Sequence, residues 1–295
     1  MKRLNIFLIV LGILFMTSCG EEFLEQYPNA SLTEDQLATK QGVDNLLIGA
    51  YAMLDGHSVD GAYWGSRGAG PTQWVSELQS GDCYKGEEPW GWQELNPIEK
   101  NEILTTNPLV DQVWNAHYDA IARANDAVRV TKLAVELENI TQEYANGVMA
   151  EARFIRAYHH FLAQLKWYQV PYITEDDDPG EVANDHLIWP ELEEDLQFCI
   201  DHLPPTQDQI GRVTSWAAKA MMARVHMFQQ DFNAARPILD DILDNGGFTL
   251  MPHYWDNFDE EKQNNTESIF EIQFAVNDGS SNSANGCLLY TSPSP

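Results

Sequence analysis

The chain has 295 residues, 44% of them apolar, and carries 45 acidic against 17 basic side chains, for a formal net charge of −28. This charge argues against binding to nucleic acid, because phosphate recognition needs cationic side chains that displace counterions, and it favours neutral or cationic ligands. The apolar content is enough for a packed core and excludes a chain kept unfolded by its charge. The length allows one large domain or two.

The amino terminus has the pattern of an export signal. Lys2 and Arg3 precede an apolar run over 6–15, and small residues then lead to Cys19. This order predicts a bacterial lipoprotein signal, so we expect residues 1–18 to be removed and lipid, palmitate included, to be attached at Cys19. The apolar run is too short to cross a bilayer core of ~30 Å, which predicts an anchored rather than a membrane-spanning protein. The alternatives are an ordinary signal peptide with an unrelated cysteine, and a buried helix.

Residues 19–38 are expected to form a lipidated tether that leads into the folded part of the chain. Two acidic residues lie beside Cys19, where anionic lipid would repel them. They belong either to a solvated tether or to a signal for export to the cell surface. Thr33 and Gln36 have the spacing of a helix capping box.

Apolar residues recur at helical spacing through much of 39–285, which we expect to be one helical domain. The first helix is expected to stop at Gly56. Residues 56–108, rich in Gly, Pro, Trp and Tyr, lose the periodicity and predict a long loop region of the kind that carries function. Two long helices follow, then a break at the proline after Val170, and Pro190 fits the first turn of a further helix. The four apolar stripes are Val43, Leu47, Ala50 and Leu54; Val113, His117, Ile121, Ala124 and Val128; Val148, Ala152, Ile155, Tyr158, Leu162 and Leu165; and Leu192, Leu196, Cys199 and Leu203.

The clearest unit spans 214–247. Thr214 is expected to cap a helix rich in small residues, Gln230 and Asp231 to form a tight turn, and Gly247 with its preceding glycine to end the second helix in a left-handed conformation. Small residues let the second helix approach closely, so this hairpin of about 34 residues resembles a tetratricopeptide repeat. The preceding helices can pair in the same way, which predicts hairpins stacked side by side.

Two features are expected near the carboxyl end. Residues 267–276 alternate apolar and polar side chains and predict a strand. Residues 286–295 resemble translated adapter sequence and are interpreted as a non-native tail, with a genuine flexible tail as the alternative.

The cysteines do not form a metal-binding pattern, because none has zinc-ligand spacing. Cys83 and Cys199 are compatible with a disulfide in an exported protein, and equally with buried, unpaired thiols.

Several polar residues receive structural interpretations. The acidic run 175–178 lacks the spacing of an EF-hand loop and is expected to be a solvated turn. Residues 159–160, both histidines, are expected to be packed or at the surface, and Glu151, Arg153 and Arg156 to form ion pairs on a helix surface. No catalytic residue, metal site or cofactor is predicted.

Several blocks along the chain, taken together, resemble the SusD/RagB family of outer-membrane nutrient-binding lipoproteins. The match runs in family order from Cys19 to about residue 276, although family members often have a glycine where Tyr168-Gln169 stands and are usually far longer. The blocks are Trp114, Tyr118, Ile121, Ala124 and Asn125; Glu151 to Tyr158 with Phe161; Asp195-Leu196 with Leu203-Pro204; Arg212-Val213-Thr214, Ala217-Ala218 and Ala223-Arg224; and Glu267 to Ile272.

The resemblance implies a fold and a function. The fold would be mostly α, with tetratricopeptide-repeat-like helical hairpins, long irregular loops and a little β, truncated at the carboxyl end so that 39–285 is incomplete. The protein would be a lipid-anchored, surface-exposed outer-membrane protein without enzymatic activity. It would bind a glycan or peptide and pass it to a SusC-like TonB-dependent transporter.

Aromatic residues of the loop region are candidate ligand contacts. Flat rings match the apolar C–H faces of sugars and lose little entropy on binding. The alternative is that the rings fasten the loop to the helical body. The candidates are Trp64, Trp74, Tyr84, Trp90 and Trp92.

Two other functions remain open at this point. A surface lipoprotein that degrades glycans would need a carboxylate pair, and acids are too abundant here for sequence to select one. A helical-repeat scaffold that binds only protein is the second alternative.

Overall fold

The computed structural model describes residues 32–55, 78–82, 84–86 and 93–273. The described residues are mostly helical, as the sequence predicts, and contain no assigned strand. The helices in chain order are α2 (Glu34–Leu37), α3 (Lys40–Tyr51), η2 (Ala52–Asp55), α5 (Leu95–Glu99), α6 (Pro108–Glu136), α7 (Gln142–Trp167), α8 (Trp189–His202), α9 (Ser215–Phe228), α10 (Phe232–Asn245), η3 (Tyr254–Phe258) and η4 (Glu260–Lys262).

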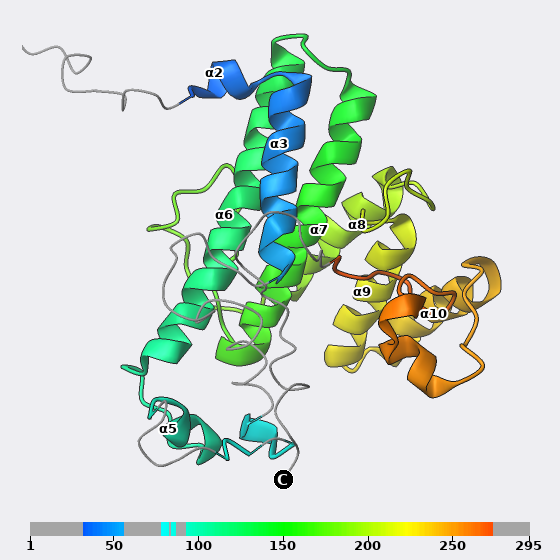
Figure 1. Cartoon of the computed structure of the whole chain (residues 1–295). Helices are drawn as coiled ribbons and strands as arrows, with labels where there is room; N and C mark the ends of the chain where they lie inside the picture. The colour runs from blue at the N-terminus through cyan, green and yellow to red at the C-terminus, as the bar shows by residue number, and fades with distance from the viewer. Residues whose placement is uncertain (1–31, 56–77, 83, 87–92, 274–295) are drawn as a thin grey trace, which may run out of the picture.

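The long helices form a stack in which neighbours along the chain are neighbours in space. From α6 to α10 each helix packs against the next, and α3 packs against both α6 and α7. Figure 1 shows α3, α6 and α7 side by side, with α8, α9 and α10 continuing the stack and α5 beyond the amino-terminal end of α6. This arrangement confirms the predicted repeat-like hairpins.

Local signals in the sequence explain where these helices begin and end. Asn107 caps α6 by accepting from the amide of Leu109 at 3.0 Å, and Thr141 caps α7 by accepting from the amide of Tyr144 at 3.2 Å. Helix α7 ends at Tyr168, which has a φ of 68°. A non-glycine residue in this region costs about 1 kcal/mol or more, so the surrounding packing must hold it there.

The hairpin of α9 and α10 follows its sequence signals. Thr214 accepts from the amide of Ala217 at 3.3 Å, and Asp231 accepts from the amide of Ala234 at 3.0 Å. The turn between the helices has Gln230 at a φ of 61°, and the predicted left-handed stop is at Gly247, with a φ of 74°.

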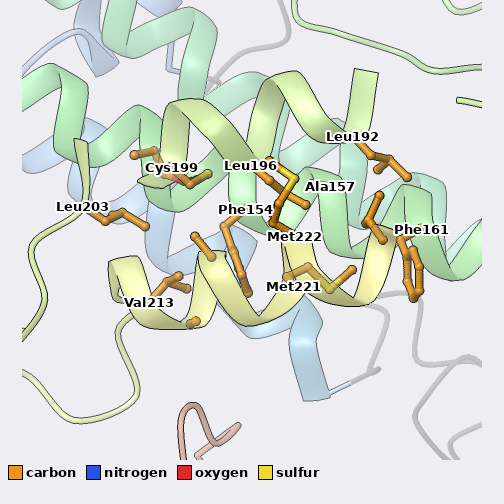
Figure 2. Packing of buried hydrophobic residues seen from close by; sticks show 14 of the residues in the cluster. Phe154, Ala157, Phe161, Leu192, Leu196, Cys199, Leu203, Val213, Met221 and Met222 are labelled. Atoms are coloured by element: carbon orange, nitrogen blue, oxygen red, sulfur yellow. The ribbon is translucent and has the colours of Figure 1, made fainter. Parts of the chain in front are cut away.

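The largest apolar core lies between α7, α8 and α9 (Figure 2). Alanines at the helix seams let the backbones approach, and larger side chains fill the space between them. Burial of each large apolar side chain stabilises the fold by roughly 2 kcal/mol. The residues labelled in Figure 2 are Phe154, Ala157, Phe161, Leu192, Leu196, Cys199, Leu203, Val213, Met221 and Met222.

Cys199 is a buried free thiol whose Sγ donates to the carbonyl of Ala150 at 3.0 Å. Of the two arrangements open for this residue, the structure therefore has the buried unpaired thiol. Cys83 lies outside the described residues.

Two predictions about local structure are wrong. The expected strand over 267–276 is not formed in its described part, 267–273, to which no strand is assigned. The segment before it meets its start, where the amide of Met251 donates to Oε2 of Glu267 at 2.8 Å. Ile269, Phe270 and Ile272 instead pack against the helices, with the Phe270 ring 5.7 Å from that of Phe154. The loop region 56–108 also contains the short helix α5, which has too few residues for its period to be visible.

None of the helices in the described ranges combines the length and the apolar content needed to cross a membrane.

Candidate functional site

The candidate ligand contacts lie mostly outside the described residues. This holds for Trp64, Trp74, Trp90 and Trp92, and also for Cys19.

Tyr84 is the one candidate ring that the structure describes. Its side chain is 82% exposed and therefore open to a ligand rather than buried against the body. The next residue is held in place, because Nζ of Lys85 donates to Oδ1 of Asn96 at 3.2 Å.

The loop region is attached to the helical body by a small apolar cluster. Leu78, Leu95 and Ile98 from the loop region are buried against Leu109 and Val113 at the start of α6. Trp167, the last residue of α7, packs on the same cluster. The described parts of the loop region are therefore fixed to the amino-terminal end of α6 and the carboxyl-terminal end of α7.

A cavity of about 600 Å³ opens at this junction, and we call it the Lys166 cavity. The loop region contributes Gln79 and residues 103–105, and α6 contributes Val110 and Val113. The remaining wall is formed by Leu162, Leu165, Lys166 and Trp167 of α7 and by Arg224 of α9.

Two cations line the Lys166 cavity. Burial lowers the pKa of Lys166 to about 8. The guanidinium of Arg224 lies over the rings of Phe161 and Phe228, 5.2 and 6.0 Å from their centroids. The ion pairs among the described residues include neither Lys166 nor Arg224, and no described acid lines this cavity.

Two buried histidines lie close to Lys166. The Nδ1 atoms of His117 and His159 are 3.2 Å apart, so one ring donates and the other accepts. Burial, followed by the charge of Lys166, lowers the pKa of His159 to about 3. Burial, followed by the charges of His159 and Lys166, lowers the pKa of His117 well below its ordinary value. Both rings are therefore neutral at pH 7, and their Nε2 atoms have no hydrogen-bond partner among the described residues.

An aromatic framework supports the same end of the stack. The ring of Trp114 is stacked on that of Tyr118 at 4.4 Å and meets Trp167 edge to face at 5.0 Å. The hydroxyl of Tyr118 donates to the carbonyl of Pro171 at 2.9 Å. Such pairs contribute roughly 0.5–1.5 kcal/mol beyond the area that they bury, so they stabilise this end of the stack.

Arg156, expected at a helix surface, is buried and joins three helices. Its Nε and NH2 atoms donate to the two carboxylate oxygens of Asp195 at 2.7 Å each, and its NH1 donates to Asn125 Oδ1 at 2.9 Å. The same NH1 lies 2.5 Å from Oε2 of Glu175. Burial alone would raise the pKa of Glu175, but Arg156 and Lys132 outweigh it and hold this pKa at about 2.

The expectation of a solvated turn over 175–178 is therefore wrong for Glu175, whose side chain is only 3% exposed. A periodic pattern places Arg156 on the helix but does not show which buried acids face it.

Glu151, also expected at the surface, belongs to a second buried cluster. It accepts from the hydroxyl of Tyr51 and pairs with Arg212, whose NH1 is 3.2 Å from Oε2. Burial raises the pKa of Glu151. The amide of Val213 donates to the Tyr51 hydroxyl at 2.9 Å, so the cluster joins α3, α7 and the segment before α9. Both clusters hold helices together, and neither opens into the Lys166 cavity.

A larger cavity of about 930 Å³ lies between α7, α9 and residues 265–272. Aromatic side chains, Tyr158 and Phe270 among them, line it together with Arg224 and with the acids Glu267 and Glu271. Its charges are therefore mixed.

Sequence reasoning did not single out Lys166, which the structure places in the wall of a cavity. One signal in the sequence could have drawn attention to it. Lys166 lies among apolar residues at the end of a long predicted helix, and the chain has few basic residues. Among the described residues, no group of three or more His, Cys, Asp or Glu side chains is placed to hold a metal ion.

Comparison with known proteins gives consistent matches. The family described as "SusD-like, starch-binding associating with outer membrane" matches residues 22–227. A SusD-like protein of Bacteroides ovatus is 23% identical over 286 residues, 92% of this chain and 50% of the relative. The SusD-like protein P25 of Formosa agariphila is 26% identical over 294 residues, 93% of this chain and 52% of the relative.

Solved structures share the fold. The surface glycan-binding protein A of Bacteroides thetaiotaomicron, solved in complex with laminarihexaose, aligns with a TM-score of 0.67 at 23% identity over 80% of this chain and 50% of its own. A SusD superfamily protein of Bacteroides vulgatus aligns with a TM-score of 0.67 at 22% identity over 79% of this chain and 50% of its own. The chain thus spans about half the length of these relatives. Because the family match covers well over half of the sequence, this chain belongs to the SusD-like family.

Proposed function

We propose that this chain is part of a surface lipoprotein that binds glycans and delivers them to a SusC-like TonB-dependent transporter in the outer membrane. The observation that carries the proposal is the family match over residues 22–227, whose description combines starch binding with the outer membrane. The likeness to a surface glycan-binding protein solved with laminarihexaose supports it.

The loop region is the proposed place of glycan contact. Exposed rings present flat apolar faces to sugar C–H groups, and the 82% exposure of Tyr84 is what such a role requires. The cluster of Leu78, Leu95 and Ile98 would hold the loop region against the helices while the rings bind. The proposed ligand contacts are Trp64, Trp74, Tyr84, Trp90 and Trp92.

The amino terminus would fix the protein to the membrane. Residues 1–18 would be cleaved, Cys19 would carry the lipid, and 19–38 would form the tether to the domain over 39–285, with 286–295 as a non-native tail. Within the proposed tether, residues 34–37 form α2, where the amide of Thr33 donates to Oε1 of Gln36 at 3.1 Å. Labelled palmitate would be incorporated into the expressed precursor and lost in Cys19→Ala.

The proposed role is binding and not catalysis. Native gel electrophoresis of the full chain through gels containing laminarin, starch, xyloglucan or acidic polysaccharides measures it directly, because a bound protein is retarded. Alanine at the four candidate tryptophans should abolish the retardation, whereas alanine at Trp255, which is 77% exposed on η3, is the matched control. Retardation that survives the four substitutions would place the glycan contact elsewhere in the protein. Absence of retardation by every glycan would favour a scaffold that binds only protein. Release of reducing ends from these glycans would favour an enzyme.

A further inference from the structure

The cavities of the described residues differ in the charge of their walls. The larger one has Arg224 with Glu267 and Glu271. A third, of about 490 Å³ beside α3, has Asp44 with Arg212. The Lys166 cavity has the cations Lys166 and Arg224 and no described acid. The chain has 45 acidic and 17 basic residues, so a cavity wall with two cations and no described acid differs in charge from the chain as a whole.

Neither cation of the Lys166 cavity is neutralised by the described residues. Other cations in this protein have close acidic partners: Nζ of Lys132 is 2.7 Å from Glu175, and Nζ of Lys219 is 2.6 Å from Asp241. Lys166 has no such partner among the residues that the structure describes, and Arg224 rests on two aromatic rings. A cation held partly out of water without a counter-charge destabilises its surroundings, and an anionic ligand would relieve this cost.

The rest of the wall suits a sugar. Trp167 and Leu162 offer apolar area to C–H faces, while Gln79 and Thr105 carry side-chain groups that can bond hydroxyls. At about 600 Å³ the cavity has the size of a small-molecule site.

We infer that the Lys166 cavity is a subsite for an acidic sugar residue, one that carries a carboxylate or a sulfate group. The anion would lie between Lys166 and Arg224, and the sugar ring would lie against Trp167. This inference rests on the proposed glycan-binding function and narrows its ligand class. The net charge of −28 does not prevent an anion from binding in the cavity. Charges more than ~8 Å away are largely screened at physiological ionic strength, so the two nearby cations dominate.

Paired ligands that differ only in charge test the inference. Calorimetry with the full chain would compare oligogalacturonate with its carboxyl-reduced counterpart, and a sulfated carrageenan oligosaccharide with its desulfated counterpart. We expect the charged member of at least one pair to bind about tenfold more tightly or better. The first pair reports on carboxylate and the second on sulfate.

Substitutions in the Lys166 cavity test whether its two cations cause the preference for charged ligands. Lys166→Met and Arg224→Met keep the aliphatic stems and remove the charges, so each should weaken binding of the charged ligand about tenfold and leave the uncharged counterpart unaffected. Lys262→Met and Arg236→Met, on exposed side chains away from the cavity, should change neither. Thermal melting would confirm that each variant is folded.

A spectroscopic measurement observes Lys166 itself. After reductive methylation with ¹³C-formaldehyde, the dimethylamine signal that is missing from Lys166→Met should shift when galacturonate is added. Equal binding of the charged and uncharged members of both pairs, or equal effects of the cavity and control substitutions, would overturn the inference and leave glycan binding intact. Failure of every glycan to bind, with no shift of the Lys166 signal, would overturn both proposals.

Discussion

At the scale of single residues, buried charge decides how the helices are joined. Arg156 contacts Asp195 on α8, Asn125 on α6 and Glu175 in the segment between α7 and α8. A guanidinium that makes a two-pronged contact with one carboxylate fixes direction as well as distance. Sequence periodicity placed Arg156 correctly on a helix and wrongly at the surface, because charged residues with buried partners look like surface residues until the fold brings the partners together.

Removal of Arg156 should strongly destabilise the fold. Arg156→Met leaves the carboxylates of Asp195 and Glu175 buried without their partner, which costs roughly 3–5 kcal/mol in the free energy of unfolding. Urea unfolding followed by circular dichroism measures the change. Arg236→Met, with a side chain 81% exposed, should stay within about 0.5 kcal/mol of the parent. A similar small change for Arg156→Met would show that the network is not structural.

The buried histidines should make stability depend on pH. The pKa of His159 is about 3 in the folded chain, and an unfolded histidine titrates near ~6.5. Below that value the unfolded chain binds more protons than the folded one, so acidification lowers the free energy of unfolding by up to about 1.4 kcal/mol per pH unit for each such histidine. Between pH 6.5 and 5, His159→Phe should give a shallower pH dependence than the parent, and His253→Gln, at an exposed position, should not. Equal slopes for the parent and His159→Phe would contradict this account.

At the scale of elements, apolar period and capping residues predicted most of the architecture. The stripes through Val113 and Val148 correctly gave α6 and α7, and Thr214 gave the start of α9. The predicted strand is not formed over 267–273, its described part. Alternation records which side chains are buried, whereas a strand also needs a ladder of backbone hydrogen bonds to a neighbour. The Lys166 cavity could not be predicted, since it forms where Gln79 and residues 103–105 meet the end of α7, a contact between distant parts of the chain.

Two glycines in different backbone conformations provide a matched test of the left-handed residue that follows α10. Gly247 has a φ of 74° with open space around its Cα, so Gly247→Ala meets no neighbour and suffers only backbone strain, about 1 kcal/mol. Gly147 lies in α7 with equally open space, and Gly147→Ala should stabilise the protein by roughly 0.5–1 kcal/mol. Thermal melting of both variants measures the difference. A neutral or stabilising Gly247→Ala would contradict the left-handed end of α10.

At the scale of the whole molecule, the described residues from α10 onward expose several large apolar side chains. The helix α10 and the residues after it carry several large side chains that are more than half exposed, an arrangement that marks contact surfaces. The main apolar core lies between α7, α8 and α9, and these exposed side chains are not part of it. The residues are Phe232, Leu243, Leu250, Tyr254, Trp255 and Phe258.

This surface should make the chain over 19–285 poorly soluble when it is produced alone. Exposed apolar area drives association, so we expect early elution from a size-exclusion column and strong binding of an apolar fluorescent dye. Glutamine at Leu243, Leu250 and Trp255 together should reduce both, whereas glutamine at Asp240, on the same helix and already polar, should not. A monodisperse parent that melts cooperatively would refute the prediction.

The length of α6 has a mechanical consequence. The first described residues, 34–38, pack near the carboxyl-terminal end of α6. There Arg129 binds Glu34, and Val130 is buried with Ala38. The Lys166 cavity opens at the amino-terminal end of α6, beside Val110. A helix rises 1.5 Å per residue, so about 30 Å of continuous hydrogen-bonded backbone separates the two. The helix α6 therefore keeps the opening of the Lys166 cavity about 30 Å from the place where Glu34 and Ala38 pack.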